Sequence, residues 1–139
     1  TTLYTCGAQC SALENPPYES EYSMLYTAKR HTDGFLRWAL DSFNAKPIES
    51  SAHRLFAAGD LYMIYPDHPG AGQQAKSSHR FEKIAAGVRD VEKIRVLRRA
   101  LPERAEQINA LLDSLGTKGD PKSELLRVMN ALYDLARES

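Results

Sequence analysis

The sequence predicts an α/β chain that forms part of a larger parallel barrel and ends in a group of helices. Short apolar runs between glycine and proline residues lie within the first 76 residues, and a helical pattern separates the first two runs. Residues 77–139 have a helical pattern almost throughout. Strands that alternate with helices are typical of parallel sheets, so the first half is expected to supply strands and the second half helices.

Three segments of the first half are candidate strands. They are Leu3–Cys6, Gly34–Leu40 and Asp60–Tyr65, the last of which is closed by Pro66. The second and third segments are apolar at nearly every position and contain aromatic and branched residues. Such runs are typical of strands covered on both faces, as in parallel sheets.

A helix is expected between the first two strands, from Ser20 to about His31. Glu21 lies in its first turn, where a negative charge is favourable, and Asp33-Gly34 ends it. A strand, a helix and a strand in this order predict a parallel crossover unit. Residues 44–59 and 67–75 are expected to be loops, and long loops in compact domains are often functional.

The second half contains three expected helices. The first begins at a cap formed by Ser77 or Ser78 and has a stripe of apolar residues over about six turns. Gly87 in its middle costs roughly 1 kcal/mol relative to alanine, so we interpret it as a place where another backbone approaches closely. Pro102 suits the first turn of the next helix, and Asp120 caps the last.

Composition excludes several classes of function. The 139 residues suit one domain, and 18 basic side chains balance 18 acidic ones, so neither nucleic acid nor a membrane is an expected partner. Cys6 and Cys10 are interpreted as plain thiols or as a local disulfide, since no further ligands stand at zinc-site spacing. No cofactor or metal is expected.

The strand pattern also predicts that the chain is a piece of a larger assembly. Three short strands in a parallel sheet leave two edges unpaired, and a barrel closes such edges with further strands. We therefore expect either more chain before Thr1, as the missing N-terminal half of a barrel, or copies that pair as a homo-oligomer.

Three ordered motifs resemble glycoside hydrolase family 123. Residues 34–39 read GFLRWA and resemble its G-x-L-R-W-A strand, and residues 58–66 read AGDLYMIYP and resemble A-G-D-x-Y-x-x-Y-P. Residues 78–82, SHRFE, with Gly87, Asp90 and Glu92 resemble S-x-R-F-E…G-x-x-D-x-E. A looser match joins residues 4–6 with Asn15-Pro16. The resemblance covers roughly residues 3–101 and omits the last two helices.

The resemblance implies a β-N-acetylgalactosaminidase-like fold and chemistry. Residues 1–101 would supply the last three strands of a TIM-type barrel, and residues 102–139 a helical extension packed on it. Such enzymes use the acetamido oxygen of the sugar as nucleophile, an Asp that orients the acetamido group, and a following Glu that protonates the leaving oxygen. No Asp is followed by Glu in this chain, so the resemblance implies that it does not hydrolyse glycosides alone. It also implies a secreted or periplasmic protein.

Candidate site residues follow from the rule that barrel enzymes place their sites at the carboxyl ends of strands. That rule selects Cys6, Trp38, Asp41, Tyr65 and Asp67. Trp38, the only tryptophan, is expected either to stack on a sugar or to pack in the barrel core. Asp41 is expected to accept hydrogen bonds from sugar hydroxyls, or else to stabilise a turn.

Other polar residues are interpreted as sugar-binding or as structural. Tyr4 is a candidate donor to the acetamido carbonyl, or a packing residue at the sheet edge; Tyr65 has the same alternatives. Asp60, at the start of its expected strand, is interpreted as structural. The motif residues on the long helix are interpreted as a structural ion network, and they are Arg80, Glu82 and Asp90. The four histidines show no ligand spacing.

Two further functions compete with a glycoside hydrolase fragment. One is a non-catalytic carbohydrate-binding or scaffolding module. The other is an interaction module in which the helices of residues 102–139 dock a partner.

Overall fold

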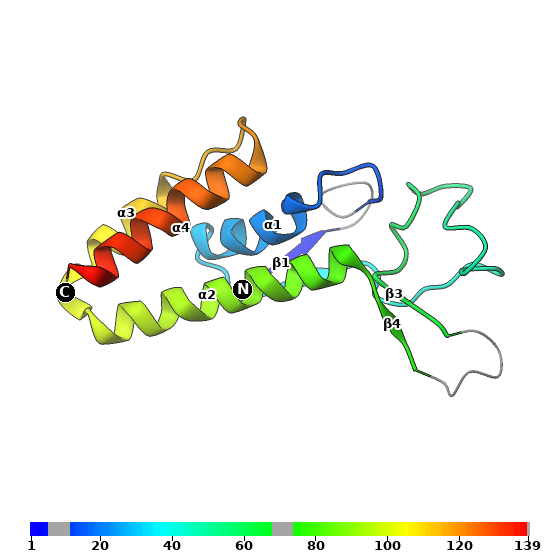
Figure 1. Cartoon of the computed structure of the whole chain (residues 1–139), viewed down its shortest axis with the longest axis horizontal. Helices are drawn as coiled ribbons and strands as arrows, with labels where there is room; N and C mark the ends of the chain where they lie inside the picture. Colours follow the sequence, from blue (N-terminus) through cyan, green and yellow to red (C-terminus); the bar gives the residue numbers. More distant parts are fainter. Residues whose placement is uncertain (6–11, 68–73, 139) are drawn as a thin grey trace.

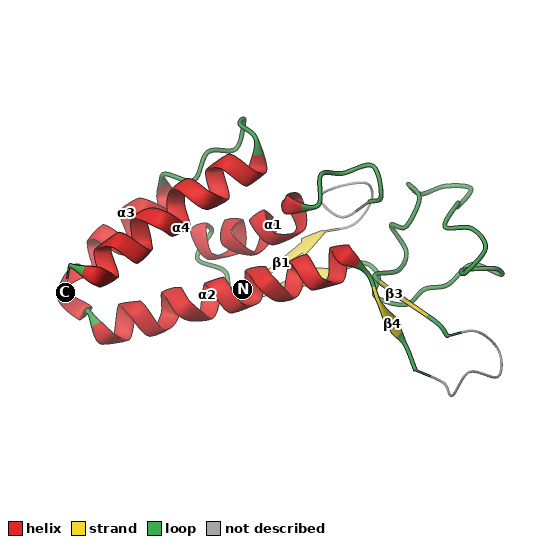
Figure 2. Ribbon diagram, in the orientation of Figure 1, coloured by secondary structure: helices red, strands yellow, loops and turns green. Residues whose placement is uncertain are grey.

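The computed structural model describes residues 1–5, 12–67 and 74–138 and has a mixed α/β fold (Figures 1 and 2). The helices lie at one end, and an irregular segment with a small hairpin lies at the other. The elements in chain order are β1 (Thr2–Thr5), α1 (Tyr18–Lys29), β2 (Gly34–Arg37), β3 (Ile64–Tyr65), β4 (Lys76–Ser77), α2 (His79–Ala100), a 3₁₀ turn (Pro102–Arg104), α3 (Ala105–Asp113) and α4 (Pro121–Arg137).

The parallel crossover unit is confirmed. β1 pairs with β2 in parallel, with Thr2 opposite Gly34 and Thr5 opposite Arg37, and α1 connects the two strands. β2 is shorter than expected and ends at Arg37, before Trp38. Two parallel strands joined by a helix bring both carboxyl ends to one side of the sheet.

The expected third parallel strand, Asp60–Tyr65, is wrong. Only Ile64 and Tyr65 form a strand, and β3 pairs antiparallel with β4. Leu61, Tyr62 and Met63 are nevertheless buried. The amide of Met63 donates to the carbonyl of Leu40 at 2.8 Å, so this segment lies beside Leu40 as irregular backbone. The segment is therefore apolar because it is buried, and not because it belongs to the parallel sheet.

The long helix α2 begins and packs as expected. The Ser78 hydroxyl accepts a hydrogen bond from the amide of Phe81 at 3.1 Å, which caps the helix. A β-carbon at Gly87 would lie 2.7 Å from the carbonyl oxygen of Glu21 and 2.7 Å from Cβ of Met24. α2 therefore approaches α1 at a distance that only glycine allows. The apolar stripe is only partly covered, since Val88 remains 47% exposed.

One hydrophobic core joins the crossover unit to the C-terminal helices. α1 lies between α2 and the α3–α4 pair (Figure 1). The side chains of this core come from all four helices and from Leu115 in the turn after α3: Leu25, Ala28, Ile94, Ile108, Leu112, Leu115, Leu125, Val128, Met129 and Leu132. Asp120 caps α4 by accepting from the amide of Ser123 at 2.9 Å, as expected. The Tyr22 hydroxyl donates to the Gly116 carbonyl at 2.6 Å and ties α1 to the turn before α4.

Candidate functional site

The backbone that follows β2 runs antiparallel to the backbone that precedes β3. The amide of Ser42 donates to the carbonyl of Leu61 at 3.0 Å, and Asp41 forms a single antiparallel bridge with Tyr62. These contacts hold residues 40–42 beside residues 61–64 at the carboxyl end of β2, the end at which parallel α/β folds place their sites.

A buried ion pair lies beneath this irregular backbone. The guanidinium of Arg37 donates to Oδ1 of Asp60, and the two side chains are 6% and 0% exposed. The same guanidinium donates to the carbonyl of Trp38 at 2.6 Å. A charge is buried at low cost only when it is paired and hydrogen-bonded, so each residue requires the other.

A second buried arginine reaches the same segment from α2. Arg80 donates to the carbonyls of Gly59 and Tyr62, the latter at 2.9 Å. Gly59 has φ +74°, a conformation that residues with a β-carbon rarely adopt. The segment 59–62 is thus fixed by a turn and by two guanidinium groups.

The ring of Tyr62 organises the loop between β2 and β3. It meets the rings of Phe43 and Tyr65 edge-on, with centroids 5.6 and 5.1 Å away. Its hydroxyl donates to the carbonyl of Ser50 at 3.2 Å. Burial, and to a smaller extent Tyr65, raises the pKa of Tyr62, while Arg80 opposes the shift. Tyr62 therefore remains a neutral hydrogen-bond donor at physiological pH.

The structure brings several expected site residues to this end of the molecule. Trp38, which directly follows β2, has its side chain 49% exposed, and Asp41 is exposed as well. The hydroxyl of Tyr65 is partly buried and accepts a long hydrogen bond, 3.5 Å, from Arg80. Tyr4 pairs with Leu36 in the sheet, but its side chain lies outside the described part of the chain.

The structure assigns Asp67 another role and does not describe Cys6. Asp67 forms an ion pair with Lys76 at 3.1 Å across the β3–β4 hairpin, so its carboxylate serves the hairpin. Cys6 lies outside the described residues, as does Cys10.

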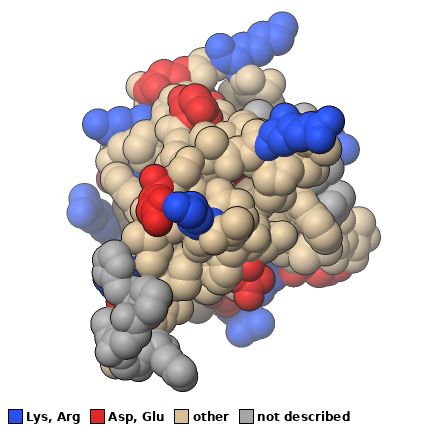
Figure 3. Space-filling model, turned by 90° about the vertical axis from the view of Figure 1, so that its right-hand side faces the viewer, with Lys and Arg blue, Asp and Glu red and all other residues tan. Residues whose placement is uncertain are grey.

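The end of the molecule that carries the irregular segment has a largely uncharged surface (Figure 3). Lys and Arg residues stand apart on it, and acidic residues separate them. The large exposed apolar side chains of β2 and the loop that follows it are Leu36, Trp38, Leu40, Phe43, Ile48, Leu55 and Phe56. An exposed indole with a carboxylate acceptor nearby suits an uncharged ligand that presents an apolar face and hydroxyl groups.

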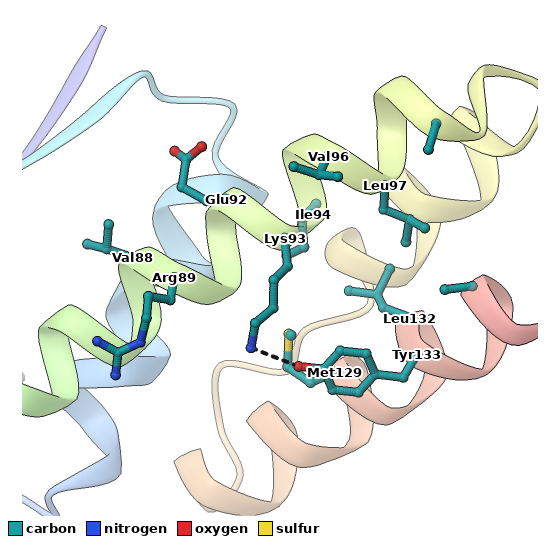
Figure 4. Close-up of a pocket in the computed structure, with 12 residues that line it drawn as sticks. Val88, Arg89, Glu92, Lys93, Ile94, Val96, Leu97, Met129, Leu132 and Tyr133 are labelled. Carbon is teal, nitrogen blue, oxygen red and sulfur yellow. Dashed lines mark hydrogen bonds between the residues drawn. The ribbon is translucent and has the colours of Figure 1, made fainter.

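A large apolar groove lies elsewhere in the described structure (Figure 4). It has a volume of about 600 Å³ and lies between α2, from Val88 to Ala100, and α4. At its rim Lys93 donates to Asp90 at 2.8 Å and to the Tyr133 hydroxyl at 3.1 Å, and the hydrogen bond to Asp90 is the main reason that the pKa of Lys93 is raised. Its apolar walls suit packing against protein rather than binding of a sugar.

Other kinds of site find no support within the described ranges. There, no three His, Cys, Asp or Glu side chains gather closely enough to hold a metal ion. No helix of the same ranges has the length and apolarity needed to cross a membrane.

Sequence reasoning missed Arg37 and Tyr62. Arg37 is a charged residue inside an otherwise apolar run, and such a residue signals a buried partner, which is Asp60. Tyr62 was assigned to a strand, and no local pattern distinguishes a strand tyrosine from one around which a loop folds. The structural interpretation of Asp60 agrees with its burial and its ion pair with Arg37. Arg80 is buried as well, where it donates to backbone carbonyls, while Asp90 pairs with Lys93.

Comparison with known proteins gives a consistent result. Residues 1–97 match the family model described as glycoside hydrolase 123, catalytic domain. The fold is similar to a family 123 glycoside hydrolase from Clostridium perfringens, described in connection with glycolipid glycan hydrolysis, with a TM-score of 0.91 and 30% sequence identity. The similarity covers 99% of this chain and 27% of that one, so this chain spans about a quarter of that enzyme. No curated protein matches the sequence.

Proposed function

The chain belongs to glycoside hydrolase family 123, and from this membership we propose that it forms the sugar-contacting, C-terminal part of a catalytic domain. In this proposal β1, α1 and β2 are consecutive parts of a TIM-type (β/α) barrel, and α2 is the helix that follows. Residues 1–101 belong to the barrel, and residues 102–139 form a helical extension. The parallel pairing of β1 and β2 around a helical crossover supports the assignment.

The proposed reaction is substrate-assisted, retaining hydrolysis of an N-acetylhexosaminide. The acetamido oxygen attacks the anomeric carbon, a carboxylate orients the acetamido group, and a neighbouring carboxylic acid protonates the leaving oxygen. The 139 residues contain no Asp-Glu dipeptide. The role proposed for this chain is therefore substrate binding, with the two carboxylates supplied by the rest of the domain.

The exposed indole of Trp38 carries the proposal. Trp38 is 49% exposed as a residue, immediately after the carboxyl end of β2, while the side chain of Arg37 beside it is buried. An aromatic ring in this place offers a flat apolar surface to the carbon-bound hydrogens of a pyranose. Asp41 would accept hydrogen bonds from hydroxyls, and Tyr65 and Tyr4 would donate to the sugar.

The sheet of this chain is expected to continue in other strands. Among the described residues, β1 and β2 pair only with each other, and Leu36 of β2 is 55% exposed. An unpaired strand edge binds further strands readily. We propose that these strands come from the remainder of the catalytic domain, or from a second copy of the chain when that remainder is absent.

A carbohydrate-binding module without catalysis is the second candidate. The observation that favours it is the lack of an Asp-Glu dipeptide in a chain that still carries Trp38 and Asp41 just after the carboxyl end of β2. Both candidate functions predict sugar binding, but only the first predicts cleavage by the complete catalytic domain. Binding and cleavage are therefore tested in separate experiments.

Binding is tested by titration of the chain with N-acetylgalactosamine while the fluorescence of Trp38, the only tryptophan, is recorded. We expect quenching or a spectral shift. Calorimetry with Asp41→Asn should show weaker binding, whereas the matched variant Asp134→Asn, on exposed α4 surface, should bind as the wild type does. No change of fluorescence and no heat with any amino sugar would reject the binding role.

Cleavage is tested with a chromogenic N-acetyl-β-galactosaminide. The 139 residues alone should release no chromophore, whereas a gene product that contains these residues and an Asp-Glu dipeptide should release it. Binding without cleavage by the longer protein would favour the non-catalytic module.

A further inference from the structure

Two buried arginines hold the backbone beside Trp38, and we propose that Arg37 positions Trp38 for the sugar while Arg80 holds the facing segment. We call Arg37 and Arg80 the arginine pair. The inference rests on the proposed function, because it takes Trp38 as the sugar-binding residue. One part of the inference, that Arg37 fixes the position of Trp38, can be tested without any sugar.

Arg37 joins Trp38 to the segment that precedes β3. One terminal nitrogen donates to the carbonyl of Trp38 at 2.6 Å, and the other donates to the carbonyl of Asp60 at 3.2 Å and to its carboxylate. The side chain of Arg37 is only 6% exposed, whereas the Trp38 indole is about half exposed. The exposed ring is therefore attached to a buried anchor one residue away.

Arg80 fixes the other side of the same arrangement. It is 7% exposed and lies in the first turn of α2, whose start is capped by Ser78. Its guanidinium donates to the carbonyls of Gly59 and Tyr62, the residues that flank Asp60 and Leu61. Arg80 therefore ties the start of α2 to the same segment that Arg37 contacts through Asp60.

Arginine suits both positions because the backbone here is irregular. Buried carbonyls outside a regular sheet or helix need donors from elsewhere. The arginine pair supplies N–H groups to four carbonyls of this irregular backbone: the buried ones of Gly59 and Tyr62, the partly buried one of Asp60 and the exposed one of Trp38. A guanidinium presents five donors in a planar fork, whereas a lysine ammonium is a point donor and cannot span two carbonyls in the same way. The charge of Arg37 is balanced by Asp60.

The test is the indole N–H signal of Trp38 in a ¹⁵N–¹H NMR spectrum, which the single tryptophan makes unambiguous. Arg37→Lys should shift or split this signal, and Arg80→Lys should shift it as well. The control is Arg54→Lys, an exposed arginine of the same loop, which should leave the signal in place. Amide signals of α4 report in each variant whether the fold is intact.

A second measurement addresses the sugar. Titration with N-acetylgalactosamine should give a dissociation constant about tenfold larger for Arg37→Lys than for the wild type, and unchanged for Arg54→Lys. If Arg37→Lys does not fold, Asp60→Asn replaces it, since Asn keeps the shape and one acceptor oxygen and removes the charge.

The outcomes are distinguishable. A folded Arg37→Lys variant with the wild-type indole signal overturns the inference, and so does a folded Asp60→Asn variant if that substitution has to be used. A wild-type chain that binds no amino sugar, together with a displaced indole in Arg37→Lys, supports the positioning of Trp38 by Arg37 and rejects the proposed function alone.

Discussion

Gly87 of α2 lies so close to Glu21 of α1 that an added β-carbon would stand 2.7 Å from the Glu21 carbonyl oxygen. Gly87→Ala should therefore destabilise the fold by about 1–3 kcal/mol, although alanine is the better helix former, because the helices must move apart. Gly119→Ala is the control, since its β-carbon would meet only Cγ of Glu124 at 3.5 Å, an ordinary contact. Urea unfolding of both variants measures the difference. Equal free energies of unfolding would contradict the close approach.

The phenol of Tyr62 predicts a loss of stability at alkaline pH. Burial raises its pKa, so the folded state keeps the proton longer than the unfolded chain. The resulting stabilisation is complete below the ordinary tyrosine pKa of about 10 and decreases as pH rises through the folded-state value. At neutral pH the free energy of unfolding of the wild type should exceed that of Tyr62→Phe by about 1 kcal/mol, because of the hydrogen bond to Ser50. The two free energies should converge at alkaline pH.

The control for Tyr62 is Tyr133→Phe, a tyrosine with a 40% exposed side chain on α4. Urea unfolding of all three proteins between neutral and alkaline pH measures the effect. If the free energies of unfolding of the wild type and Tyr62→Phe differed by the same amount at every pH, the role of the neutral phenol would be contradicted.

The C-terminal helices are expected to be part of the folded unit. Ile108 of α3 is fully buried in the core shared with α1 and α2, so Ile108→Ala should cost about 2–5 kcal/mol. Leu126→Ala, at a side chain that is 44% exposed, should cost much less. Thermal unfolding followed by circular dichroism compares them. If Ile108→Ala had no larger effect than Leu126→Ala, α3 and α4 would not be part of the folded unit formed by α1 and α2.

Association of the isolated chain is the last expectation. Its open strand edges should bring copies together, so sedimentation should give a mass above the 15.6 kDa of one chain. Leu36→Asp, on the exposed sheet surface, should reduce association, whereas Val96→Asp, in the groove between α2 and α4, should not. A cooperative melt at the mass of a single chain would contradict the proposal, and dissociation by Val96→Asp alone would place the contact in the groove.

The helices could be predicted from the sequence because their signals are local. Ser78 and Asp120 stand at the caps where they were expected, and the close approach at Gly87 followed from its cost in a helix. The parallel crossover was equally accessible, because Asp33-Gly34 marks the change from the helical pattern to β2, which begins at Gly34.

The segment before β3 could not be predicted, because burial and strand pairing give the same apolar signal. Leu61 and Met63 are buried, as strand residues would be, but irregular contacts with Leu40 and Ser42 replace a ladder. The position of Trp38 and Asp41 near the carboxyl end of β2 could be predicted, because it follows from the parallel crossover. Their support by Arg37, Arg80 and Tyr62 depends on contacts between distant residues. A charge within an apolar run indicates that Arg37 has a buried partner, but local sequence does not identify Asp60 as that partner or indicate the contacts of Arg80 and Tyr62.

The loop that folds around Tyr62 contains buried residues that maintain its backbone and exposed residues that can be substituted. Tyr62 is buried and holds the loop through its ring and hydroxyl, whereas Ile48 and Leu55 extend outward with 41% and 76% of their surface exposed. Substitution of such outward residues should change the surface at this end of the molecule at little cost in stability. If the proposed function holds, this surface is where recognition beyond the sugar itself can be altered while the backbone beside Trp38 stays the same.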